Sequence, residues 1–279
     1  MLRVQAPLVD FPWEGEGYPI GDRLRIVPAP NDFRWDAEGA RYFLSEDERE
    51  TARAAAHWIE IDQLGDDKTS AAAKINAFLI GLWIVRPTLT HVAIRFENGP
   101  DGVSVSRMLD RFQWIKDELH PDLREEHLAR VRTLVPGLLR ILGDRGRLNN
   151  ALTLTFRGCV SIDWQSSFVC FAAALEGLLN YESHGGITQR LAANYCNLVT
   201  RYDAGSAKDH SAFVNLYNVR SEIVHGRAYE RESSVRNVEE LAACSQVLRR
   251  VWRVLLEHEE VREALEGEDT DRARLLAAP

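Results

Sequence analysis

The sequence predicts a mainly α-helical protein in two parts, an N-terminal α+β region (residues 1–147) and a C-terminal antiparallel helical bundle (residues 148–279). Two observations lead to this prediction. Residues 1–45 are rich in proline, glycine and aromatic side chains, which permit short strands but interrupt long helices. Residues 163–258 carry apolar side chains at helical spacing with short connections, which is typical of antiparallel neighbours in a bundle.

Composition limits the classes of function. The chain has 279 residues, 45% of them hydrophobic and 27% charged, which is ordinary for one large or two smaller globular domains. Its net charge of −8 argues against a protein that coats nucleic acid by bulk attraction. Any contact with RNA must therefore come from a local basic patch.

The N-terminal region is expected to alternate strands and helices. Residues 23–27 and 89–97 alternate in the manner of half-buried strands, and the turn at 98–102 leads to a hairpin partner at 103–105. Ser45 with Glu48 resembles a capping box that opens a helix through about Glu60. Further helices are expected from Asp67 or Thr69 to Pro87, over 106–119, and over 121–142 with an interruption at Pro136-Gly137.

The C-terminal region is expected to contain four helices. The apolar patterns cover residues 163–182, 188–202, 209–225 and 238–258, and Gly226 follows the third pattern, where C-terminal glycines are common. Residues 257–274 are read as a charged tail.

Other features point to a cytoplasmic protein. The four cysteines form no C-x-x-C pair, and three of them lie inside helical patterns as small apolar residues, which indicates a reducing compartment. The longest apolar stretch, Ala77–Val85, is too short to cross a membrane, and the N-terminus does not resemble a signal peptide. His120 and His127 flank an acidic stretch, but Pro121 favours a capped helix start over a metal site.

The third bundle helix contains the most informative motif, Tyr217-Asn218-Val219-Arg220-Ser221-Glu222-Ile223-Val224-His225-Gly226. Arg220 and His225 have the R-x4-H spacing of HEPN domains. The first bundle helix adds Ala174-Leu175-Glu176-Gly177-Leu178-Leu179. Together these segments resemble the Apea-like branch of the HEPN superfamily. The resemblance covers about a third of the chain and does not reach residues 1–145.

The spacing alone is not specific. Arg86 with His91 and Arg253 with His258 repeat it elsewhere in the chain. The first pair spans Pro87 and leads into a predicted strand, and the second lies at the end of a helix that runs into the charged tail. Arg220 and His225 alone have the neighbours that the resemblance requires.

The resemblance implies a metal-independent endoribonuclease that works as a homodimer without a cofactor. Arg220 would hold the RNA phosphate and His225 would act as general base or acid, because imidazole ordinarily exchanges a proton near neutral pH. It also implies a prokaryotic toxin or antiviral defence effector with a possible inhibitor or antitoxin protein. Ser221 departs from the Asn, Asp or His common at that position in active relatives. Arg227 likewise replaces the Tyr that some antitoxins modify.

The residues themselves add geometric expectations. Arg220 interrupts an apolar stripe and therefore needs a partner, for which Glu176 is the best candidate. His225 lies about 140° further around an ideal helix, so the two side chains converge through the length of arginine, the helix end, or a second copy of the chain. Asn218, Ser221 and Glu222 are expected to support the site, and Arg227, Arg231 and Arg236 to form a basic rim for RNA.

Two alternatives remain open on the residues. Arg220 and Glu176 form either part of an active site or a purely structural ion pair, and His225 either transfers protons or binds the last carbonyl groups of its helix. The competing function is a non-catalytic HEPN module that binds RNA, a nucleotide or a partner protein.

Overall fold

The chain folds into an N-terminal α+β unit and a C-terminal all-helical unit, which confirms the predicted fold class. In the computed structural model the two units separate between Leu139 and Arg140, inside helix α4 (Glu125–Gly143). The structure describes residues 2–31, 45–65, 67, 69–99, 102–108, 120, 122–181, 186–203, 210–226 and 234–277, without the side chains of residues 48 and 234–236.

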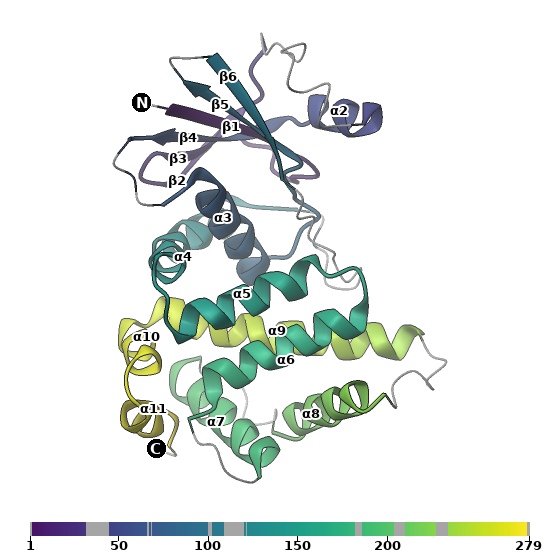
Figure 1. Cartoon of the computed structure of the whole chain (residues 1–279), viewed down its shortest axis with the longest axis vertical. Helices are drawn as coiled ribbons and strands as arrows, with labels where there is room; N and C mark the ends of the chain where they lie inside the picture. The colour runs from purple at the N-terminus through teal and green to yellow at the C-terminus, as the bar shows by residue number, and fades with distance from the viewer. Residues whose placement is uncertain are drawn as a thin grey trace. The chain divides into compact units, whose positions relative to one another are not determined.

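The N-terminal unit is built on a six-stranded antiparallel sheet (Figure 1). Its order is β2-β3-β4-β1-β5-β6, so the first strand of the chain lies in the interior of the sheet. The bounds are β1 Leu2–Leu8, β2 Tyr18–Gly21, β3 Leu24–Pro28, β4 His57–Gln63, β5 Ile94–Gly99 and β6 Gly102–Arg107.

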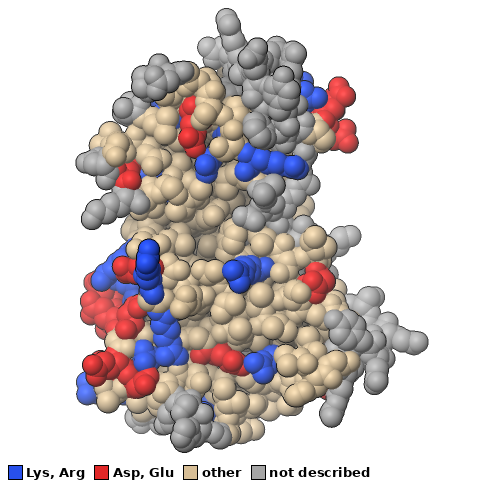
Figure 2. All heavy atoms as spheres, in the orientation of Figure 1, with Lys and Arg blue, Asp and Glu red and all other residues tan. Residues whose placement is uncertain are grey.

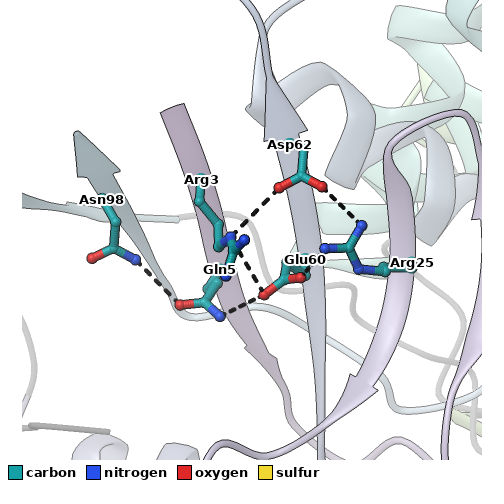
Figure 3. A network of polar contacts seen from close by, with 6 residues as sticks. All are labelled: Arg3, Gln5, Arg25, Glu60, Asp62 and Asn98. Carbon is teal, nitrogen blue, oxygen red and sulfur yellow. Dashed lines mark hydrogen bonds and ion pairs between the residues drawn. The ribbon is translucent and has the colours of Figure 1, made fainter. Parts of the chain in front are cut away.

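The two central strands carry apolar and polar residues in alternation. Val4 on β1 lies opposite Ile61 on β4, and both are fully buried. The adjacent pair, Gln5 opposite Glu60, belongs to a polar network on the sheet (Figure 3). This pattern fixes the register, because a slip of one residue would exchange the two faces.

Two long helices lie together on one side of the sheet (Figure 1). Helix α3 (Ala71–Val85) is apolar around most of its circumference and almost entirely buried. It approaches α4 closely at Gly81, where an added Cβ would lie 3.2 Å from Cγ1 of Val131. A helix that is apolar on all sides needs neighbours on all sides, and α3 has them.

Three expectations for the N-terminal unit were wrong. The helix predicted through Glu60 is α2 (Glu46–Arg53), and the following residues form β4, because their aromatic and β-branched side chains suit a strand bonded on both edges. Ser70, not Asp67 or Thr69, caps α3, and its hydroxyl accepts a hydrogen bond from the Ala73 amide at 3.2 Å. Helix α4 continues through Pro136 and Gly137, because the packing of buried neighbours such as Leu138 offsets the missing hydrogen bond.

Two further expectations for this unit were met in part, and a third finds no support in the described residues. The predicted hairpin is present as β5 and β6, although β5 begins at Ile94 and not at residue 89. Strand β3 covers the predicted segment 23–27 with a shift of one residue. A helix was predicted over 106–119, but residues 106 and 107 belong to β6. Residues 109–119 lie outside the described residues.

Within the described residues from 147 onward, the helical unit contains the four predicted helices and three others. Those predicted are α6 (Trp164–Leu179), α7 (Ile187–Tyr202), α8 (His210–Val224) and α9 (Ser234–Glu257). Helix α9 lies along the other helices (Figure 1) and contributes the fully buried Trp252, whose indole N–H donates to the Thr155 hydroxyl at 2.9 Å.

The three helices that were not predicted complete the unit. Helix α5 (Arg147–Val160) begins at the predicted division between residues 147 and 148. It packs so closely on α6 that a Cβ at Gly158 would clash with the Phe171 ring. The expected charged tail folds as α10 (Glu259–Glu266) and α11 (Asp269–Leu276), since Leu265 and Leu276 are buried. Arg147 caps the end of α6 by donating to the carbonyl groups of Gly177 and Asn180.

Candidate functional site

Helix α8 carries the motif and ends directly after it. The last helical residue is Val224, and the amide of His225 still donates to the carbonyl of Ser221 at 3.0 Å. Gly226 follows in the left-handed conformation, with φ of 75°, which a side chain would oppose. The sequence therefore places His225 at the point where the helix ends.

Arg220 lies within the buried side of α8. Phe213, Leu216, Tyr217 and Ile223 are all buried around it. The guanidinium reaches across to α6, where its nitrogen lies 3.1 Å from Oε1 of Glu176, as predicted. The exposed fractions of the two side chains are 34% and 24%, so this ion pair remains in contact with solvent.

Tyr217 is a third member of this cluster that the sequence reasoning did not assign to the site. Burial, with Glu176 beside it, raises the pKa of its hydroxyl far above the ordinary range, so the hydroxyl stays protonated. The Tyr217 hydroxyl and Nε of Arg220 are both buried, and among the described residues this Nε has no hydrogen-bond partner. Tyr217 lies three residues before Arg220, a spacing that places both on one helix face and is the signal that could have revealed it.

His225 lies apart from the arginine. Its side chain is exposed, and five helical positions separate it from Arg220 by about 140°. The buried side of α8 directs Arg220 toward α6, while the imidazole is on the open side. One copy of the chain therefore presents the two groups in different directions.

The residues predicted to support the site lie at different places in the helical unit. Glu176 contacts Arg220, whereas Asn218 and Glu222 line a groove of about 490 Å³ between α8 and α9. Glu239 and Glu240 of α9 form the other wall of this groove, which makes it acidic. Ser221 is exposed and does not line this groove.

The expected basic rim lies mostly outside the described residues. Arg227 and Arg231 belong to the segment between α8 and α9 that is not described, and for Arg236 the structure gives only the backbone, within α9. On the face drawn in Figure 2, the acidic and basic side chains of the helical unit are interspersed and do not gather by sign.

The other two pairs with R-x4-H spacing have structural contacts. Arg86 donates to the carboxylate of Asp122 at 2.5 Å and to its backbone carbonyl at 2.8 Å. The backbone of His91 forms a bridge with Val9. His258 caps α10, and its ring lies 4.9 Å from that of Tyr202.

The described residues contain no group of three or more His, Cys, Asp or Glu side chains suited to holding a metal ion. None of the four cysteines forms a disulfide, and burial raises the pKa of Cys170. None of the described helices has the length and apolar character needed to cross a bilayer.

Comparison with known proteins identifies no relative. No protein-family model matches the chain, and neither the curated proteins nor the solved structures give a significant match. The resemblance to HEPN domains therefore rests on the sequence of residues 174–179 and 217–226 alone.

Proposed function

We propose that this chain is a metal-independent endoribonuclease of HEPN type that acts as a homodimer. The observation that carries the proposal is that the Arg220 side chain is paired with Glu176 and is also partly exposed to solvent. Glu176 anchors its guanidinium at 3.1 Å, yet 34% of the arginine side chain remains exposed. A guanidinium held on one side and open on the other is suited to binding a phosphate.

The chemistry uses the nucleophile that RNA itself carries. The 2′ oxygen forms a bond to the adjacent phosphorus while the bond from phosphorus to the 5′ oxygen breaks, which leaves a 2′,3′-cyclic phosphate and a 5′ hydroxyl. His225 accepts the proton of the 2′ hydroxyl or donates one to the departing 5′ oxygen. Arg220 stabilises the charge on the phosphate oxygens. DNA lacks the 2′ hydroxyl and is not a substrate.

A second copy of the chain completes the site in this proposal. Within one copy the exposed imidazole and the anchored guanidinium lie about 140° apart around α8. A two-fold pair would bring His225 of one copy to Arg220 of the other, as composite sites in symmetric dimers do. In this role the protein is a cytoplasmic toxin or antiviral defence effector, with a separate protein as its inhibitor.

The ion pair between Arg220 and Glu176 is also compatible with one alternative function, a non-catalytic domain. If Arg220 serves only to neutralise Glu176, the domain is a non-catalytic HEPN module that binds RNA, a nucleotide or a partner protein. The two functions differ in what the Arg220→Ala substitution does, since a structural arginine affects folding and a catalytic arginine affects turnover.

A cleavage assay distinguishes them. Wild type, Arg220→Ala, His225→Ala and His258→Ala are incubated with single-stranded RNA in the presence of a chelator, after circular dichroism confirms that each is folded. We expect wild type to release cyclic phosphate ends, and the first two variants to be slower by about 100-fold or more. His258→Ala, from a pair with the same spacing, keeps full activity. A folded wild type that leaves RNA intact, or equal cleavage by His225→Ala, contradicts the proposal.

A further inference from the structure

The N-terminal unit contains a cavity that the proposed nuclease site does not use. Its volume is about 590 Å³, within the range of small-molecule sites. The cavity lies where β1 ends, and its walls also come from the end of α2 and from the loop before β5. We propose that it binds a small organic cation, namely a primary ammonium group on an apolar stem.

The walls of the cavity are mostly apolar. Leu8 is fully buried, Phe11 and Pro12 follow it, and residues 54–56 are three alanines. Leu89 also lines the cavity and is 50% exposed, which makes it one of the few large apolar side chains open to solvent among the described residues. A ligand with an apolar stem would cover this surface, and removing it from water is favourable.

One carboxylate is placed at this apolar wall. Asp10 lines the cavity and its side chain is 55% exposed, so it is accessible to a ligand. His91 lies 3.9 Å from this carboxylate, and His120 is the other polar side chain of the lining. A negative group beside low-dielectric walls concentrates the local field and attracts a cation.

Phe11 adds an attraction for an ammonium group. It lines the cavity, and an aromatic ring attracts a cation through its π face. The end of α2 also lies beside the cavity, but Arg53 in its last turn opposes the partial negative charge of the last carbonyl groups. The preference for a cation therefore rests on Asp10 and Phe11.

The backbone holds Asp10 in place before any ligand binds. Its φ of 53° is in the left-handed region, which aspartate adopts more readily than most residues with a side chain. Val9 and His91 exchange two backbone hydrogen bonds of 3.0 and 3.1 Å, and the Thr90 hydroxyl donates to the Asp10 carbonyl at 3.2 Å. A carboxylate on a backbone fixed in this way is preorganised for a ligand.

Two substitutions test the carboxylate with little effect on the fold. Asp10→Asn removes the charge and keeps the left-handed conformation, because asparagine tolerates it as well as aspartate. Asp22→Asn is the matched control, since Asp22 lies in the same unit with a side chain that is 91% exposed and away from the cavity.

Binding is measured on the full chain by calorimetry and ligand-observed NMR with three probes of similar size: 2-phenylethylammonium, 2-phenylethanol and 3-phenylpropanoate. We expect the ammonium probe to bind saturably and more tightly than the other two. Asp10→Asn should weaken the ammonium probe by roughly 10- to 100-fold, the range for a hydrogen bond to a charged group, and leave the alcohol unchanged. Asp22→Asn should bind as wild type does.

Several results would overturn the proposal. They are the absence of saturable ammonium binding at millimolar concentration, propanoate binding at least as tight as that of the ammonium probe, and unchanged binding by Asp10→Asn. If Asp10→Asn does not fold, the comparison of the three probes on wild type still decides the sign of charge that the cavity accepts. RNA cleavage is not part of the readout, so the two proposals fail independently.

Discussion

Both units contain an arginine paired with a partly buried carboxylate, and the two arrangements differ in how completely they are closed. On the sheet, Glu60 accepts hydrogen bonds from Arg25 and from Gln5, the latter at 2.7 Å, and Arg3 lies 4.0 Å away (Figure 3). Asp62 bonds to the same Arg25 at 2.8 Å. In the helical unit, by contrast, Arg220 has one ion pair among the described residues, with Glu176.

The difference concerns what an additional anion would meet in each arrangement. The charges of Arg3, Arg25, Glu60 and Asp62 balance within the network, so an additional anion would meet two carboxylates. Around Arg220 one positive charge meets one negative charge, and 34% of the arginine side chain is exposed. The network stabilises the sheet, whereas a single ion pair that solvent reaches is the arrangement that the proposed phosphate site requires.

The strongest test of this comparison asks whether a second copy of the chain completes the open pair. Arg220→Ala and His225→Ala, each inactive alone, are mixed under conditions that exchange subunits. If the site takes Arg220 from one copy and His225 from the other, half of the dimers in an equal mixture are mixed, and each has one intact site out of two. Cleavage should then recover to roughly a quarter of the wild-type rate.

The same mixture can contradict the composite site. If both groups of a site come from one copy, no pairing of the two variants restores an intact site and the mixture stays inactive. A mixture of Arg220→Ala with itself, carried through the same exchange, is the control for activity gained by handling alone.

A smaller effect is expected when each carboxylate is made neutral without a change of shape. Glu60→Gln removes a charge that is 9% exposed and shared by several donors, so we expect the free energy of unfolding to fall by about 1–2 kcal/mol. Glu176→Gln removes a charge in an ion pair that solvent reaches, and the expected loss is about 0.5 kcal/mol or less. Urea denaturation of both variants measures the two values. Equal losses, or a larger loss for Glu176→Gln, would mean that the Arg220 pair is a structural element after all.

The sequence predicted the helical unit better than the sheet, for a physical reason. Helices α6 to α9 have one face toward the core, and this produces a periodic pattern in the sequence. Strand β4 lies in the interior of the sheet and is buried at its first five residues. Its sequence alternates only from Ile59 onward, and its first residues, up to Glu60, were read as the end of a helix. Helices α10 and α11 were missed because few apolar residues, such as Val261 and Leu265, anchor a mostly charged surface.

Only part of the candidate site could be predicted from the sequence. A guanidinium in an apolar stripe requires a carboxylate, and this argument found Glu176 correctly. The buried hydroxyl of Tyr217 and the acidic groove beside Asn218 depend on how α6 and α9 approach α8. Distances between helices that are separated in the chain are not encoded in the spacing within one helix, so these features required the structure.

The smallest effect concerns His127, which lies near Arg86 and is kept neutral. Glu60 and Glu176, by contrast, are charged partners of their arginines. Burial of His127, and then the positive charge of Arg86, lower the pKa of its imidazole below the ordinary 6.5. The neutral ring is also needed as an acceptor, because its Nδ1 accepts a hydrogen bond of 3.0 Å from the Arg124 amide at the start of α4. The folded state therefore favours the unprotonated form.

The direction of the pH dependence follows from this lowered pKa. The unfolded chain takes up a proton near pH 6.5 while the folded chain resists it, so the stabilisation is present above that pH and is lost as the pH falls through the lower, folded value. Between pH 7.5 and 5.5 wild type should lose more stability to urea than His127→Gln, which keeps an uncharged acceptor. The lowered pKa values of Asp67, Asp122 and Asp163 act below this window, because their ordinary value is 3.8. An equal pH dependence for wild type and His127→Gln would contradict a lowered pKa of His127. It would mean that carboxylates alone neutralise the positive charge of the arginines in this unit.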